Sequence, residues 1–163
     1  MKKTIAALLL LVVLLAAVGA GTESAAADPA VQSASGFGQV HLGLPFRNFA
    51  FSATKQTDGT TSGQAQLERS DNGILAHIDI DCLNVLGNVA VMSGMYTRAT
   101  NPALVGSDAL FAVKDNGEGP GAPPDEITLA FSGLGIPCTY IIDPAQLALF
   151  FVPIESGQVQ VSS

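Results

Sequence analysis

The sequence predicts an all-β protein, namely a single antiparallel β-barrel or sandwich of about 8–10 short strands with one disulfide. Three observations support this class. Apolar and polar residues alternate with period two along most of the chain. Turn residues such as Asp58-Gly59 and Gly87-Asn88 interrupt the alternation at regular intervals. No window of twelve residues carries the apolar stripe of an amphipathic helix, except for one possible turn at 144–147.

The N-terminus has the order of a secretory signal peptide. Lys2 and Lys3 give a positive start, residues 5–18 form an uninterrupted run of 14 apolar residues, and Ala25-Ala26-Ala27 supplies small residues for cleavage. The run is shorter than the roughly 20 residues that span a bilayer. We expect cleavage after Ala27, or alternatively after Ala20, although an uncleaved anchor is a further alternative. The mature protein is then secreted, with no membrane span.

The charge balance narrows the class of partner. The chain has 7 basic and 14 acidic side chains, a net charge of −7. Cleavage would remove Lys2, Lys3 and Glu23, leaving 5 basic and 13 acidic side chains and a net charge of −8. Such a surface repels phosphate backbones, so we expect no nucleic-acid partner. The same balance is compatible with divalent cations.

The mature chain reads as one domain. Residues 28–35 are small and polar and predict a flexible tether, followed by the all-β domain at 36–163. Large side chains at inward positions of the predicted strands favour a filled core; these are Phe49, Phe51, Phe111 and Phe131. Strands are predicted near 49–54, 64–68, 76–82, 89–97, 108–114, 126–131, 147–152 and 158–162.

Two cysteines lie in the mature part. In an oxidising compartment Cys82 and Cys138 are expected to form a disulfide, and two separate buried thiols are the alternative. Closing a loop of about 56 residues stabilises the fold by roughly 4 kcal/mol in the chain-entropy treatment.

A short frame recurs three times along the chain. Residues 38–42, 63–67 and 157–161 each read Gly-Gln-apolar-polar-apolar. One interpretation is that each glycine ends a turn and alternation then begins. The other is that the first and last strands pair, so that no sheet edge remains open.

Several segments resemble a known kind of domain. Residues 49–53, the turn at 58–59 with 63–67, and 79–83 recur in that order, followed by 89–94 and by 111–119 with Asp125. This arrangement is similar to the small β-domains of exported bacterial proteins that follow repeat or adhesion modules (post-COAP-like domains). The resemblance implies a compact extracellular accessory domain without established catalytic residues.

The segment 115–126 is a candidate calcium site. It offers carboxylate and amide oxygens from Asp115, Asn116, Glu118 and Asp125, and calcium prefers six to eight oxygen ligands. It is not an EF-hand, because glycines occupy ligand positions and strands flank it. Asp, Asn, Gly and Pro also build ordinary turns, so a plain connecting loop is the alternative.

A second candidate metal site is His77, Asp79 and Asp81. Residues i, i+2 and i+4 of a strand share a face, so one imidazole and two carboxylates would line up for zinc or manganese. The alternative is a solvated strand face opposite the apolar residues that alternate with them.

The function expected from these features is an exported, non-catalytic binding or interaction module of unknown ligand and partner. One alternative is a lipocalin-like carrier of a small apolar ligand, which requires a cavity of several hundred cubic ångströms. Another is a secreted hydrolase or isomerase on a β-barrel. A serine or threonine with His41 or His77 would serve, but no Gly-x-Ser-x-Gly elbow is present.

Overall fold

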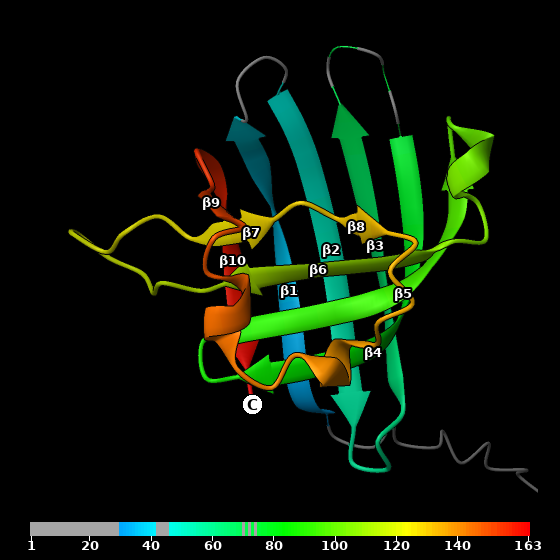
Figure 1. Cartoon of the computed structure of the whole chain (residues 1–163). Helices are drawn as coiled ribbons and strands as arrows, with labels where there is room; N and C mark the ends of the chain where they lie inside the picture. Colours follow the sequence, from blue (N-terminus) through cyan, green and yellow to red (C-terminus); the bar gives the residue numbers. More distant parts are fainter. Residues whose placement is uncertain (1–29, 42–45, 70, 72, 74) are drawn as a thin grey trace, which may run out of the picture.

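The computed structural model of the chain describes residues 30–41, 46–69, 71, 73 and 75–163. The all-β prediction is confirmed: over these residues, strands are connected by turns and by three short 3-10 segments (Figure 1). The predicted signal peptide and its cleavage site lie outside the described residues. The strands are β1 (Ala30–His41), β2 (Phe46–Gln56), β3 (Thr61–Arg69), β4 (Leu75–Leu86), β5 (Val89–Ala99), β6 (Asp108–Lys114), β7 (Glu126–Thr128), β8 (Phe131–Ser132), β9 (Phe151–Pro153) and β10 (Ser156–Ser162).

The strands form one antiparallel sheet that curls into a half-barrel. Its order is β10-β1-β2-β3-β4-β5-β6-β7-β9, and β8 pairs with β6 beside β7. Figure 1 shows β1, β2 and β3 running along one direction while β5 and β6 cross in front of them. The two parts of the sheet therefore pack face to face at a steep angle, as in orthogonal β packings.

A bulge in β4 lets the sheet change direction. Ile80 pairs with Gly94 of β5 and Cys82 pairs with the adjacent Ser93, so Asp81 is an extra residue on β4. The bulge shifts the alternation by one residue. As a result, Ile80 and Leu83 are both buried in the main core, and Cys82 is free to contact the opposite side of the sheet.

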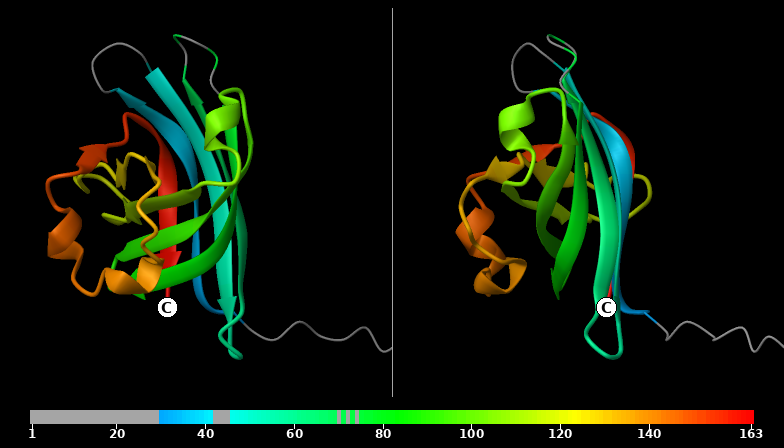
Figure 2. Two further views of the ribbon diagram at one scale, coloured as in Figure 1. Left: turned by 45° about the vertical axis from the view of Figure 1, so that its right-hand side comes forward. Right: turned by 90° about the vertical axis from the view of Figure 1, so that its right-hand side faces the viewer.

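The sheet buries apolar residues on two sides. The main core lies inside the curl and contains Phe49, Phe51 and Phe111, as predicted. A second cluster on the outer side of β5 and β6 is covered by residues 133–150, which form a third layer (Figure 2). Phe131 was predicted to fill the main core, which is wrong: it packs on this second cluster, edge-to-face with Phe150.

The third layer is attached to β4 by the predicted disulfide. Cys82 and Cys138 are bonded, with 5.8 Å between their Cα atoms. Cys138 begins the 3-10 segment η2 (Cys138–Tyr140) and is fully buried. The one-turn prediction at 144–147 is also confirmed, by the 3-10 segment η3 (Pro144–Leu147). The remaining 3-10 segment, η1 (Pro102–Leu104), connects β5 to β6.

The predicted tether 28–35 is wrong from residue 30 onward. Residues 30–35 form the first half of β1 and pair with β2, and from Ser33 also with β10. The period-two signal is present but weak there, because the buried apolar residue is the small Ala34 and the residue in phase with it is the polar Gln32. Small side chains suffice at this position because large phenylalanine rings from β2 fill the core.

The first and last strands pair, but the barrel does not close. Gly36 of β1 lies opposite Val159 of β10, in agreement with the interpretation that pairs these strands. A side chain at Gly36 would meet the Phe51 ring at 2.8 Å, so glycine lets that ring pack against the β1 backbone. The prediction that no edge remains is wrong for the described strands, because β9 and β10 end the sheet order and do not pair with each other. Within the described residues, no helix is long and apolar enough to cross a membrane.

Candidate functional site

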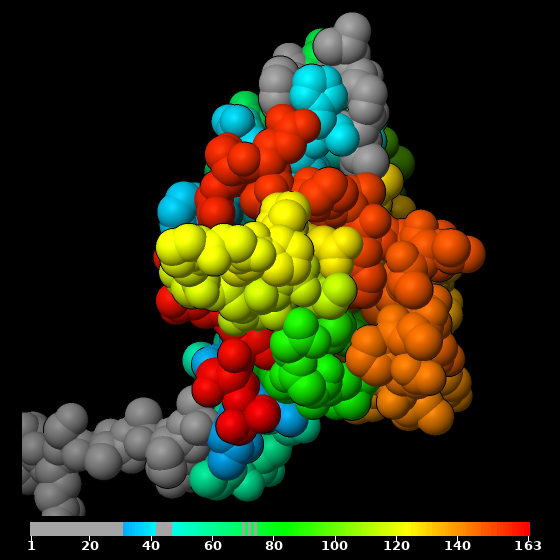
Figure 3. Space-filling view, turned by 90° about the vertical axis from the view of Figure 1, so that its left-hand side faces the viewer, coloured from blue at the N-terminus to red at the C-terminus, as the bar shows by residue number. Residues whose placement is uncertain are grey.

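The predicted calcium loop covers the free edge of β10. Asp115 follows β6 and Asp125 precedes β7, and the segment between them lies across the C-terminal strand (Figure 3). Oδ2 of Asp125 accepts the backbone N–H of Val159 at 2.8 Å, and Oδ2 of Asp115 accepts that of Val161 at 3.1 Å. The two carboxylates thus occupy the place of a neighbouring strand.

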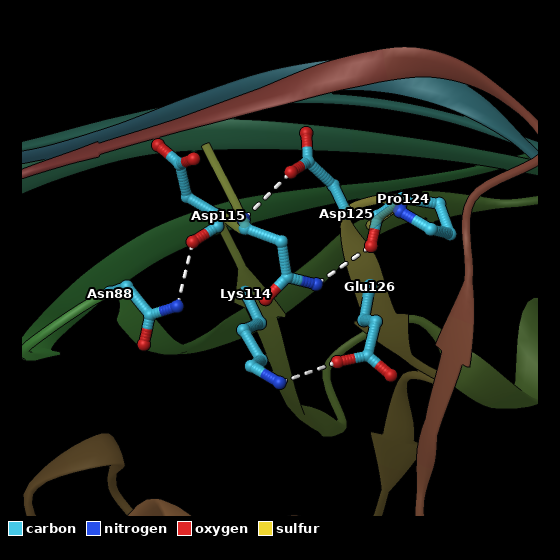
Figure 4. A network of polar contacts seen from close by, with 7 residues as sticks. Asn88, Lys114, Asp115, Pro124, Asp125 and Glu126 are labelled. Carbon is cyan, nitrogen blue, oxygen red and sulfur yellow. Dashed lines mark hydrogen bonds and ion pairs between the residues drawn. The ribbon is translucent and has the colours of Figure 1, made fainter. Parts of the chain in front are cut away.

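The other carboxylate oxygens hold the loop itself. Oδ1 of Asp125 accepts the N–H of Asn116, and Oδ1 of Asp115 accepts that of Gly117, each at 2.8 Å. The Asn116 side-chain amide donates to the Pro124 carbonyl at 2.7 Å (Figure 4). A cation here would have to share or displace these bonds.

Two further polar contacts stabilise the base of this loop, and neither involves Glu118. Lys114 and Glu126 form an ion pair of 2.8 Å across β6 and β7, and Asn88 donates to the Asp115 carbonyl (Figure 4). Glu118 is exposed. No group of three or more His, Cys, Asp or Glu side chains is arranged for a metal within the described part of the chain. Calcium binding stays a prediction.

The second predicted metal set lies on the outer face of β4. His77 is half-buried opposite Gln66 of β3, and Asp79 is exposed opposite Gln64. Asp81 is the bulge residue, so it departs from the regular alternation that would align it with the other two.

Of the serine and histidine residues considered for catalysis, Ser93 and His41 make contacts with other residues of the protein. Ser93 is buried, and its Oγ accepts the backbone N–H of Cys138 at 3.0 Å, so it helps to seat the third layer. Ser132 is exposed at the end of β8. His41 lies 3.6 Å from Glu155. That the protein is not an enzyme stays a prediction.

A cavity of about 330 Å³ lies at one end of the half-barrel. It is open to solvent on one side and is bordered by residues of β1 to β5 and by the connection from β7 to β8, which crosses β2 and β3 (Figure 1). Its lining is mainly apolar, and includes Val40, Phe49, Leu67, Ala76, Tyr96, Leu104, Ile127, Leu129 and Ala130. This volume falls in the range of small-molecule sites. Hollows of about 340 and 500 Å³ lie on the outer sheet face. The larger one is lined mainly by polar side chains, among them Ser52 and Gln64.

The path of residues 128–130 forms one wall of the cavity. β6 pairs with β7 at Val113 and with β8 at Leu110, but between them the chain detours. Thr128 is buried there, and its hydroxyl oxygen accepts the backbone N–H of Ala112 at 2.9 Å. This bond satisfies the amide left over by the detour. Leu129 and Ala130 are then free to line the cavity.

Two arginines line the mouth of the cavity. Arg47 of β2 and Arg69 of β3 lie directly opposite each other, in phase with the inward residues of their strands. Arg69 forms a two-bond ion pair with Asp71, with distances of 2.7 and 3.1 Å. Burial and the neighbouring Arg69 charge lower the pKa of Arg47, and Asp71 opposes this shift.

Tyr96 places a phenol in the same wall. Its side chain is almost fully buried. Burial raises the pKa of Tyr96, and the negative charge of Asp108 adds to the effect. The phenol is therefore a neutral hydrogen-bond donor at ordinary pH.

The cavity residues were not predicted as a site from the sequence. A signal was present, because Arg47 falls in phase with Phe49 and Phe51 and Arg69 in phase with Leu67, where a filled core would place apolar residues.

Comparison of the chain with known protein families, with curated proteins and with solved structures finds no match. The resemblance to post-COAP-like domains therefore stays a prediction.

Proposed function

We propose that this protein is an exported, non-catalytic binding module that holds a compact, largely apolar small molecule in the cavity at the end of its half-barrel. The main support for this proposal is the cavity, which has a volume of about 330 Å³ and a mainly apolar lining. Burial of apolar ligand surface in such a space supplies the free energy of binding.

The surroundings of the cavity support this role. The rest of the half-barrel is filled by large side chains such as Phe51 and Phe111, which contact edge-to-face with ring centroids 6.0 Å apart. The space is therefore localised at one end, as expected for a site.

A neutral, solvatochromic aromatic probe such as N-phenyl-1-naphthylamine tests the proposal. We expect saturable fluorescence enhancement with one site per chain. Ala130→Leu would place a larger side chain into the cavity, because Ala130 is a half-buried lining residue. It should weaken probe binding by about tenfold, since tenfold corresponds to only about 1.4 kcal/mol.

Ala145→Leu is the matched control, because Ala145 is exposed in η3, away from the cavity. Absence of saturable binding, or equal binding by both variants, would contradict the proposal. Export is tested separately: the mature N-terminus of secreted protein should be Asp28.

A further inference from the structure

The cavity mouth carries an imbalance of charge. Arg47 and Arg69 face each other across neighbouring strands, and like charges directly opposite are unfavourable in a sheet. Such a pair persists when something offsets the repulsion. Asp71 does so for Arg69, through both carboxylate oxygens.

Arg47 has no ion pair of this kind in the described part of the chain, and the charge of Asp71 acts on it only as a weaker, opposing influence on its pKa. Among the described residues, the Nε of Arg47 is buried without a hydrogen-bond partner. A buried, unsatisfied donor on a cation is costly. Its position inside the lining of a largely apolar cavity indicates a group that is completed by a ligand rather than by the protein.

The other acidic groups near the cavity do not neutralise Arg47. Glu68 contributes to the rim, but its side chain is exposed and it alternates with the inward Leu67 and Arg69. Asp108 acts on Tyr96 and also accepts the backbone N–H of Gly135 at 2.7 Å. Among the described residues, the guanidinium of Arg47 is therefore left without a carboxylate bonded to it.

We propose that the ligand of this cavity is an amphipathic carboxylate, with its apolar body among Phe49, Leu67 and Ile127 and its carboxylate on the guanidinium of Arg47. This inference rests on the proposed function of the cavity and adds the chemical class of the ligand. A guanidinium presents a planar pair of donors that matches a carboxylate in a two-bond geometry. A single carboxylate offsets the single unpaired charge.

The test compares two ligands that differ only in the head group. Decanoate and 1-decanol compete against the neutral naphthylamine probe on wild-type protein, Arg47→Met and Arg98→Met. Arg98 is an exposed arginine of β5 outside the cavity lining, so it controls for loss of one positive charge. On wild type we expect decanoate to compete at a concentration at least about tenfold below that of decanol. The ratio should fall to near one in Arg47→Met and stay unchanged in Arg98→Met.

The outcomes separate the two proposals. If probe and decanol bind but decanoate binds no better, the carboxylate inference is overturned while the cavity function stands. If neither probe nor either ligand binds, both are overturned. If Arg47→Met keeps the wild-type ratio of decanol to decanoate concentrations, another residue binds the carboxylate and the assignment to Arg47 is wrong. Should Arg47→Met fail to fold, added salt provides the second readout, because it should weaken decanoate binding and leave decanol unchanged.

Discussion

The carboxylate of Asp125 accepts the backbone N–H of Val159 at 2.8 Å. Val159 belongs to β10, the strand at one end of the sheet order. Asp115 makes the equivalent bond to Val161, two residues further along β10. An unpaired strand edge is a template for unwanted association. In this protein two carboxylates accept the backbone N–H groups of the β10 edge, in place of the carbonyl groups of a neighbouring strand. The short strand β9 pairs with β7 and not with β10.

Removing this cap should destabilise the fold. Asp125→Ala leaves the amides of Val159 and Asn116 without acceptors, and we expect a loss of about 2–3 kcal/mol in the free energy of unfolding. Urea denaturation measures it. Glu118→Ala is the matched control, an exposed carboxylate of the same loop, and should change stability by less than about 0.5 kcal/mol. Equal effects of the two substitutions would mean that the cap contributes nothing.

Calcium binding by the same loop is a separate prediction. A loop site with a Kd of roughly 0.1–1 mM would add about 1.4 kcal/mol of stability at ten times its Kd. Melting wild type and Asp115→Ala in 5 mM calcium and in excess chelator tests this. A calcium site raises the wild-type midpoint only. If Asp115 acts purely through its bond to Val161, the variant loses the same stability in both solutions and calcium shifts neither protein.

The disulfide should hold the third layer on the sheet. Replacing Cys82 and Cys138 together with alanine is expected to lower the free energy of unfolding by roughly 4 kcal/mol, because the bridge closes a long loop. Equilibrium urea unfolding of the oxidised wild type and of the double variant gives this difference. A change below about 1 kcal/mol would contradict the prediction. Thiol titration of denatured, unreduced protein should find none free.

The parts of the fold that follow from local pattern were predictable. In β2 the inward residues are Phe49, Phe51 and Ala53, and the core face of the strand was predicted correctly. The disulfide followed from cysteine number and the expected compartment. The start of β1 was missed, because small residues at Ser33 to Ser35 carry little hydrophobic contrast.

The parts decided by pairing and packing were not predictable in the same way. The bulge at Asp81 reverses the phase of β4, and only its register with β5 reveals it. Phe131 packs on the second cluster and not in the main core. Alternation could not predict this, because both faces of the sheet are buried there. The cavity depends on the detour after Thr128, a tertiary feature. In the sequence, only the inward phase of Arg47 and of Arg69 indicated it.

The change of strand direction at the Asp81 bulge of β4 should depend on Gly94 of the neighbouring strand β5. Gly94 is buried in β5 and pairs with Ile80 of β4. A Cβ atom at Gly94 would collide with the carbonyl oxygen of Asp79 and would lie 2.8 Å from the Cα of Ile80. Both are backbone atoms, so a rotamer change cannot relieve the contact, and the two strands would have to separate. We therefore expect Gly94→Ala to cost at least about 3 kcal/mol, as overpacking in a core does at its upper end.

Gly87→Ala is the control for this prediction. Gly87 has a φ of 64° in the turn between β4 and β5, and a Cβ atom there would meet nothing within 4 Å. Its substitution should cost only the strain of a left-handed backbone, about 1–2 kcal/mol. Urea unfolding of both variants measures the difference. If Gly94→Ala is no less stable than Gly87→Ala, the close approach of β5 to β4 is not what requires glycine at this position.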